Sequence, residues 1–287
     1  MESSKIIRII SELFVPELLV FNLSFIYVGM LFAWPVSLRS AVLITIAFLS
    51  ARGAALVMNR YIGRDFDLQN KKKANMASLT VPRNVLMAVF IGFCAVFISS
   101  AWLLNTLSLL LAPLLIALFI LDPLLKRHTS HRHYSVGLVE GFDPMAGYIG
   151  AAGVIPFLPA LYLLMLGIMF LGGGSDVLYT IKHAEFDRAH GLKTYPAKYG
   201  FKKAAKLSSY SHAISSLFIF LFAAASNSYV ILLGAVVAVY LISRQHINLM
   251  PEDEGIMRRY VLLNTAAALS VLASAAVSIF IFNIAIF

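Results

Sequence analysis

The sequence has little charge and almost no cysteine. Only 13% of its 287 residues are charged, whereas a typical soluble domain has roughly 25%. The single cysteine, Cys94, lies in an apolar run, so an intramolecular disulfide is excluded. Hydrophobic residues make up 60% of the chain, which is more than a globule of this size needs for a core. The composition therefore predicts an all-α integral membrane protein, with the bilayer as solvent.

The sequence also lacks a polar domain, a low-complexity linker and a cleavable leader. Lys5 and Arg8 precede the first apolar stretch without a small-residue cleavage pattern, so we expect that stretch to be retained as a span. A helix needs roughly 20 apolar residues to cross a bilayer. Such runs predict a bundle of about nine transmembrane helices in one domain, 1–287. They are Pro16–Pro35, Ala41–Met58, Val85–Leu104, Leu107–Leu125, Val136–Ile155, Pro159–Tyr179, Leu207–Ala225, Tyr229–Ser243 and Val261–Phe287.

Positive charge is unevenly distributed among the connections. The 23 Lys and Arg residues lie almost entirely at the N-terminus and in alternate loops. The opposite connections hold only Arg39, and Arg52 lies within a span. This asymmetry places the N-terminus and the charged loops in the cytoplasm, at a cell membrane. We expect no nucleic-acid partner, because no folded polar domain interleaves basic and aromatic residues.

The second predicted span continues into a polar helix end. At 100° per residue, Arg52, Asn59, Gly63 and Asp67 share about a quarter of the helix circumference. Asp65 points elsewhere and is interpreted as a solvated interfacial charge. Because a charge inside hydrocarbon is costly and usually functional, Arg52 is a candidate site residue.

The sixth predicted span behaves in the same way. Asp176, Thr180, His183 and Asp187 follow one another at i, i+4, i+7 and i+11, which is one stripe of a regular helix. Asp176 directly follows an apolar, glycine-rich run, so its charge is predicted to be functional. Two polar stripes at one membrane surface indicate a weak internal repeat with a site between its halves, at two aspartate-bearing helix ends on the cytoplasmic side.

These side chains predict a metal and a phosphate ligand. Carboxylates with an asparagine are hard oxygen ligands that suit Mg²⁺, which also binds substrate phosphates. The predicted catalytic and metal-binding residues are Asn59, Asp67, Asp176 and Asp187. A basic rim surrounds them, and a lipid with a diphosphate head would fit such a site. The predicted diphosphate-binding residues are Arg52, Lys72, Lys126 and Arg127.

At this point the residues resemble the UbiA superfamily of intramembrane prenyltransferases, over most of the chain. Two stretches are similar to the family's aspartate-rich motifs: Asn59-Arg60-x-x-Gly63-x-x-x-Asp67-x-x-Asn70 and Asp176-x-x-Tyr179-x-x-x-His183-x-Glu185-Phe186-Asp187-Arg188. Further similarity lies in Lys126-Arg127-His128-Thr129, in Gly141-x-x-Pro144-x-x-Gly147 and in Asn264. The ending of the second motif resembles the quinone-biosynthesis branch, which prenylates 4-hydroxybenzoate or a dihydroxynaphthoate.

The resemblance implies a prenyltransferase mechanism. Mg²⁺ bridges the acids to an isoprenyl diphosphate, Lys and Arg neutralise it, and the allylic C–O bond ionises. The carbocation then attacks an electron-rich aromatic ring, or another lipid-pathway acceptor, inside a cavity that excludes water. The same resemblance assigns Tyr179, His183 and Asn264 to the acceptor side of the site or to support of the catalytic groups.

The sequence departs from the family pattern at Gly63 and His183, which stand where the family has aspartates, and at Lys182 and Asp122. One interpretation is that the chain is active with a reduced acid set, its lost metal charge replaced by the loop lysines 71–73. Another is that it binds an isoprenoid lipid without transfer, or is a partner subunit of an active enzyme. A secondary transporter is disfavoured, because the stripes lie at one surface and not at the midplane.

Three histidines, His128, His131 and His133, occupy the short loop after the fourth predicted span. They are interpreted as ordinary solvated residues, with binding of an acidic acceptor as the alternative.

Overall fold

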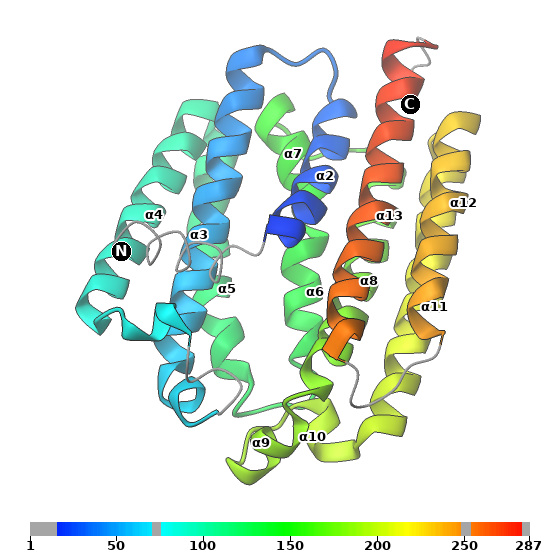
Figure 1. Cartoon of the computed structure of the whole chain (residues 1–287). Helices are drawn as coiled ribbons and strands as arrows, with labels where there is room; N and C mark the ends of the chain where they lie inside the picture. The colour runs from blue at the N-terminus through cyan, green and yellow to red at the C-terminus, as the bar shows by residue number, and fades with distance from the viewer. Residues whose placement is uncertain (1–15, 71–75, 248–253, 283–287) are drawn as a thin grey trace.

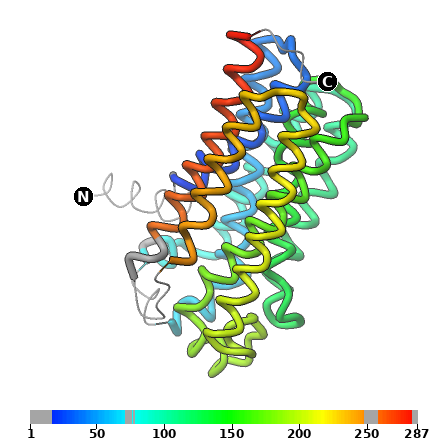
Figure 2. Tube along the Cα trace, turned by 90° about the vertical axis from the view of Figure 1, so that its right-hand side faces the viewer, coloured from blue at the N-terminus to red at the C-terminus, as the bar shows by residue number. Residues whose placement is uncertain are grey.

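The structure is a computed structural model that describes residues 16–70, 76–247 and 254–282. In these ranges the chain is helical and contains no strand. The long helices run side by side, and the short helices α9 and α10 lie at one end of the bundle (Figures 1 and 2). The helices are α2 (Pro16–Leu31), α3 (Leu38–Gln69), α4 (Arg83–Leu104), α5 (Thr106–Leu125), α6 (His133–Gly141), α7 (Asp143–Ala152), α8 (Pro159–Ile181), α9 (Ala184–Ala189), α10 (Tyr195–Tyr199), α11 (Phe201–Ala225), α12 (Tyr229–Ser243) and α13 (Glu254–Phe280), with short 3₁₀ turns at Ala77–Thr80 and Arg244–His246.

Within the described ranges, seven helical segments are long and apolar enough to cross a membrane: α3, α4, α5, α8, α11, Tyr229–His246 and Arg258–Phe280. The first described helix, α2, is apolar but shorter. Large apolar side chains such as Trp102, Leu110 and Leu233 are more than 60% exposed, as expected for faces that meet lipid. These features indicate a multi-pass membrane protein. The count of nine spans and the cytoplasmic placement remain predictions.

The span predicted over Val136–Ile155 is not one helix. α6 ends at Gly141, Phe142 forms the junction, and α7 begins directly afterwards. Pro144 lies in the first turn of α7, where a missing N–H removes no intrahelical hydrogen bond. The prediction of a single helix here is therefore wrong, although both halves are helical.

The helix α3 is longer than the predicted span Ala41–Met58. It extends from Leu38 to Gln69 without interruption, so it carries the polar segment after Met58 on a regular helix. α3 packs against α4 and α5, around buried side chains that include Val57 and Phe90. This packing fixes the direction in which the end of α3 emerges from the bundle.

The largest core cluster joins α2, α8, α11, α12 and α13. α8 lies between α6 and α11, and α2 lies between α7 and α13. Leu161, Leu164, Ile168 and Leu171 of α8 are fully buried. α8 is therefore the central helix of this half, and its far end delivers Asp176.

Two glycines allow α2 and α7 to touch backbone to backbone. A Cβ built on Gly147 would lie 1.9 Å from the Ile26 carbonyl oxygen, and one on Gly29 would lie 1.8 Å from that of Pro144. We expect Gly147→Ala to lower the free energy of unfolding by about 1–3 kcal/mol, because the added Cβ overpacks against rigid backbone. Gly92→Ala is the matched control, since its Cβ would meet nothing within 4 Å. Thermal unfolding in detergent checks this; equal melting temperatures for the two variants would contradict it.

Candidate active site

The polar end of α3 is held by ion pairs. Arg60 Nη1 lies 2.5 Å from Asp67 Oδ2, one side chain reaching the other along the helix. Asp65 instead faces Arg83, whose Nη2 lies 2.7 Å from each of its carboxylate oxygens. That pair is exposed, as predicted for an interfacial charge. Asn59 is exposed as well. The surviving acid of the first motif is thus engaged by an arginine of the same motif.

The end of α8 differs from the predicted stripe. α8 ends at Ile181 and α9 begins at Ala184, so the prediction of one regular helix through Asp187 is wrong. The chain turns at His183. Asp187 is only 7% exposed, and its Oδ2 accepts a 2.9 Å hydrogen bond from the Thr194 hydroxyl. Asp187 therefore joins α9 to the segment before α10.

The two motif-bearing helix ends meet at one end of the bundle. Asn70 caps α3, and its Nδ2 lies 3.5 Å from Nδ1 of His183, with both side chains buried. Arg127, just after α5, lies over the ring of Phe66 on α3, 5.1 Å from its centroid. The prediction that the two polar ends share one end of the bundle is confirmed.

Two side chains at the start of α6, the Arg132 guanidinium and the His133 imidazole, contact the Asp176 carboxylate. Its Oδ2 lies 2.6 Å from His133 Nδ1 and 3.2 Å from Arg132 Nη2. The Arg132 guanidinium is also 3.9 Å from Asp122, which accepts a hydrogen bond from Ser135. Arg132 is 5% exposed, so the pair is largely shielded from water.

The hydrogen bonds of His133 define its tautomer. Its Nε2 accepts a hydrogen bond from the backbone N–H of Tyr195 at 3.1 Å. Nδ1 therefore carries the ring proton and donates a hydrogen bond to Asp176. His133 is fully buried, and the interpretation of this histidine as a solvated loop residue is wrong. His128 and His131 are exposed, as that interpretation expects. The sequence offered no local signal for this pairing, because its partners lie 43 residues apart.

Other predicted residues have identifiable places. Asn264 is 5% exposed, donates to the Ser175 hydroxyl at 2.8 Å and accepts from Gln245 at 2.6 Å, so it ties α13 to the residue before Asp176. Tyr179 is 42% exposed and lies under the Lys182 ammonium. The Lys126 carbonyl accepts the backbone N–H of Lys193. Lys72 lies outside the described residues.

Deeper in the bundle is a polar cluster that the sequence analysis found only in part. Glu140 and Asp143 lie inside the apolar run of the fifth predicted span, beside Asn22 of α2. Asn22 Nδ2 donates to Asp143 Oδ2 at 2.8 Å. Arg52, the one member predicted as a site residue, interacts electrostatically with both acids. Acids within an apolar run are the signal that would have identified the cluster.

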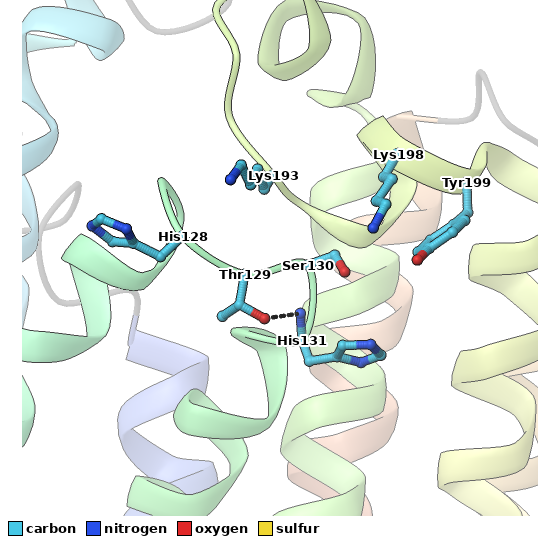
Figure 3. A pocket seen from close by; sticks show the side chains of 7 residues that line it. All are labelled: His128, Thr129, Ser130, His131, Lys193, Lys198 and Tyr199. Atoms are coloured by element: carbon cyan, nitrogen blue, oxygen red, sulfur yellow. Dashed lines mark hydrogen bonds between the residues drawn. The ribbon is translucent and has the colours of Figure 1, made fainter.

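A pocket of about 470 Å³ opens at the same end as α9 and α10. Figure 3 shows that its lining comes from two facing segments, the loop after α5 and the chain around α10. The lining residues are His128, Thr129, Ser130, His131, Lys193, Lys198 and Tyr199, and none is acidic. A hydrogen bond from Lys198 lowers the pKa of the Tyr199 phenol. The pocket therefore presents positive charge and hydroxyl groups.

The described residues do not fit the predicted Mg²⁺ site. In 16–70, 76–247 and 254–282 no three His, Cys, Asp or Glu side chains are grouped so that they could hold a metal ion. Asp67 and Asp176 each have an arginine within ion-pairing distance, and Gly63 and His183 contribute no carboxylate.

Sequence comparison identifies relatives. The sequence model of the UbiA prenyltransferase family matches residues 22–267. A 4-hydroxybenzoate octaprenyltransferase of Alkalilimnicola ehrlichii is 26% identical over 57% of this chain and 56% of that protein. One from an Azoarcus species is 27% identical over 63% of each. These alignments span less than two thirds of the curated relatives.

Comparison with solved structures extends over more of the chain. A UbiA homologue from Aeropyrum pernix is 26% identical, with a TM-score of 0.82 over 92% of this chain and 98% of that one. A UbiA homologue from Archaeoglobus fulgidus, described as bound to GPP and Mg²⁺, has a TM-score of 0.70 at 17% identity, over 93% and 99% of the two chains. The second similarity concerns the fold alone.

Proposed function

Because the chain belongs to the UbiA prenyltransferase family, we propose that it transfers a prenyl group from an isoprenyl diphosphate to an acceptor within the membrane. The acceptor class is an electron-rich aromatic ring or another lipid-pathway molecule. We further propose that the charged end of the bundle lies in the cytoplasm of the cell membrane, as the distribution of Lys and Arg predicts.

The observation that carries this proposal is the contact between Asn70 and His183. It brings the end of α3 against the turn that follows α8, which supports one shared site over two separate surfaces. Cationic side chains lie on both sides of this junction, with Arg127 against α3 and Arg132 against Asp176 on α8. An anionic head would be held here, and an apolar chain would extend among the helices.

The chemistry follows from these positions. In the donor, the bond between C1 and the bridging oxygen breaks, and both electrons leave with the diphosphate. Lys126, Arg127 and the basic pocket would stabilise that leaving group electrostatically. The allylic cation then forms a carbon–carbon bond with an aromatic acceptor, and the ring proton that this acceptor loses passes to the released diphosphate. The apolar bundle keeps water from capturing the cation.

A second candidate function has its own observation. The ion pairs of Asp67 with Arg60 and of Asp176 with Arg132 occupy acids that the family motifs use. A chain in which these acids only anchor arginines would bind an isoprenoid lipid without transferring it, either alone or as a partner of an active enzyme. The experiment below separates the two candidates.

We expect the full-length protein in lipid nanodiscs to convert geranylgeranyl diphosphate and an acceptor into a prenylated product, detected by mass spectrometry. The acceptors are 4-hydroxybenzoate, hydroquinone and glycerol 1-phosphate, each with Mg²⁺ and with chelator. A double variant, Lys126→Met/Arg127→Met, should lower product formation at least about tenfold, because two leaving-group cations are lost from a partly screened site.

Lys202→Met is the matched control, because Lys202 is exposed on α11 and lies outside the pocket lining. Its product formation should equal that of the parent. Donor binding without any product, across all acceptors and metal conditions, would reject the transferase and leave the lipid-binding function.

A further inference from the structure

The basic pocket continues onto the surface of α11. Figure 3 shows Lys198 and Tyr199 beside each other, on the opposite side of the pocket from His128. The Lys198 ammonium lies 4.9 Å from the centre of the Tyr199 ring, and the Lys203 ammonium lies 5.8 Å from the centre of the same ring. Both lysines are exposed. One tyrosine therefore joins the lining of the pocket to the first turn of α11, with two positive charges against its ring.

The lysines of α11 begin a stripe of side chains that runs into the apolar part of the helix. Lys203, Lys206 and Tyr210 follow at i, i+3 and i+7, and Ile214 and Leu217 continue on the same face. We call these five residues the α11 stripe. The Lys206 ammonium lies 5.5 Å from the centre of the Tyr210 ring, and Tyr210 and Leu217 are each 57% exposed. The stripe therefore presents cations, then a tyrosine, then apolar side chains, which is the order in which a lipid presents its head and its chains.

The lysines of the stripe lie at the depth of the lipid headgroups. The apolar run of α11 begins at Leu207, and Lys203 precedes it by four residues, or about 6 Å along a helix. The hydrocarbon core is about 30 Å thick and the whole bilayer about 40–45 Å, so the headgroup layer extends roughly 5–7 Å beyond each side of the core. Exposed cations at this depth meet lipid phosphates. Tyrosine is typical of the same layer, because its ring is apolar and its hydroxyl is polar.

The surface carries no opposing charge. The sequence has no Asp or Glu between Asp187 and Glu252, and the lining of the pocket, all of it described, includes none. Thr129 and Ser130 add hydroxyl groups to that lining. Membrane orientation requires positive charge in this part of the chain, but it does not require that the lysines lie against exposed tyrosines above an apolar stripe. A basic pocket at the end of transmembrane helices is the kind of site that binds a lipid phosphate.

We propose that the pocket and the α11 stripe bind one anionic phospholipid, with its phosphate between Lys198 and Lys203 and an acyl chain along the apolar part of the stripe. Net negative charge selects this lipid, because a zwitterionic lipid brings its own ammonium group against the lysines. Free phosphate lacks the chain that the stripe would contact. The two lysines are distinct from Lys126 and Arg127, which are proposed to stabilise the leaving group, so lipid binding does not depend on prenyl transfer.

The test is a titration of the full-length protein in a neutral detergent, followed by native mass spectrometry at constant ionic strength. The ligands are phosphatidylglycerol and phosphatidylcholine with identical acyl chains, so they differ only in the headgroup. We expect the first phosphatidylglycerol to bind at least about tenfold more tightly than phosphatidylcholine, since each lysine near the phosphate contributes roughly fivefold. Millimolar inorganic phosphate should leave this preference in place, because it makes no contact with the apolar part of the stripe.

The double variant Lys198→Gln/Lys203→Gln should bind the two lipids equally, and each single variant should lose about fivefold in affinity for phosphatidylglycerol. Both side chains are exposed, so every variant should keep the elution and melting temperature of the parent, which are measured alongside. Arg244→Gln/Arg258→Gln is the matched control. It removes two exposed cations beside α12 and on α13, at the same end of the bundle (Figure 1), and should retain the full preference.

Three results would overturn the proposal. Equal affinity of the parent for the two lipids would show that charge does not select the ligand. A preference that persists in the lysine double variant, or that falls equally in the arginine control, would show that these lysines do not define a site. Displacement of the lipid by inorganic phosphate would make the pocket a site for free anions. Lys126→Met/Arg127→Met should keep the lipid preference while losing transfer, so this proposal and the proposed function can fail separately.

Discussion

An Arg132→Met variant is expected to lose about 3 kcal/mol of folding stability, because it leaves the Asp176 carboxylate inside the bundle without its arginine. Arg132 is 5% exposed and lies 3.2 Å from Asp176 and 3.9 Å from Asp122. The expected cost lies at the lower end for a broken buried pair, since the two acids retain partial contact with solvent and His133 still donates to Asp176. Unfolding in mixed micelles, followed by circular dichroism, measures the loss.

Two companion variants make this result specific. Arg132→Met/Asp176→Asn removes both charges. We expect this double variant to recover part of the stability lost in Arg132→Met, which a double-mutant cycle would measure as a coupling energy between the two residues. Arg83→Met breaks the exposed pair with Asp65, whose side chains are 51% and 67% exposed, and should cost less than about 1 kcal/mol. If Arg132→Met and Arg83→Met cost the same, the buried network does not stabilise the fold.

The sequence located the helices well because a membrane span requires a long apolar run, which composition alone displays. The extension of α3 to Gln69 was also readable, since nothing after Met58 interrupts a helix. The end of α8 was not. No proline or glycine lies between Ile181 and Ala184, so the turn there depends on tertiary contacts such as that of His183 with Asn70, which periodicity does not contain.

The sequence predicts which residues belong to the site, but not which side chains they contact. The sequence predicts Asp176 to be a costly charge near hydrocarbon, and the family resemblance implies a metal beside it. In the structure its partners are Arg132 and His133, which come from the start of α6, 44 and 43 residues earlier in the chain. Glu140 and Asp143 are not among the predicted residues, because the two motifs carry their acids at helix ends, although the cost of charge is greatest within the span.

The two missing acids can be tested by restoring them. We expect the double variant Gly63→Asp/His183→Asp to acquire Mg²⁺-dependent donor binding, with an affinity about 100-fold higher in Mg²⁺ than in chelator. A Cβ at Gly63 meets only Asp67 Oδ2, at 3.7 Å, so the new side chain fits beside an existing acid. At about 4 Å, each carboxylate attracts a dication with about 2 kcal/mol even in a water-like dielectric. Two such carboxylates together exceed the free energy of about 2.7 kcal/mol that a 100-fold increase in affinity requires.

The parent should bind the same donor with less than about a threefold difference between Mg²⁺ and chelator, because Arg60 and Arg132 already neutralise the acids that a metal would need. Mn²⁺ titration by electron paramagnetic resonance gives a second measurement that requires neither donor nor turnover. The isosteric variant Gly63→Asn/His183→Asn is the control: it adds the same volume without charge and should bind like the parent. Strong metal dependence in the parent would mean that the ion pairs open when the donor binds. In that case, the arginines that hold Asp67 and Asp176 would be acting as displaceable counter-ions of a working metal site.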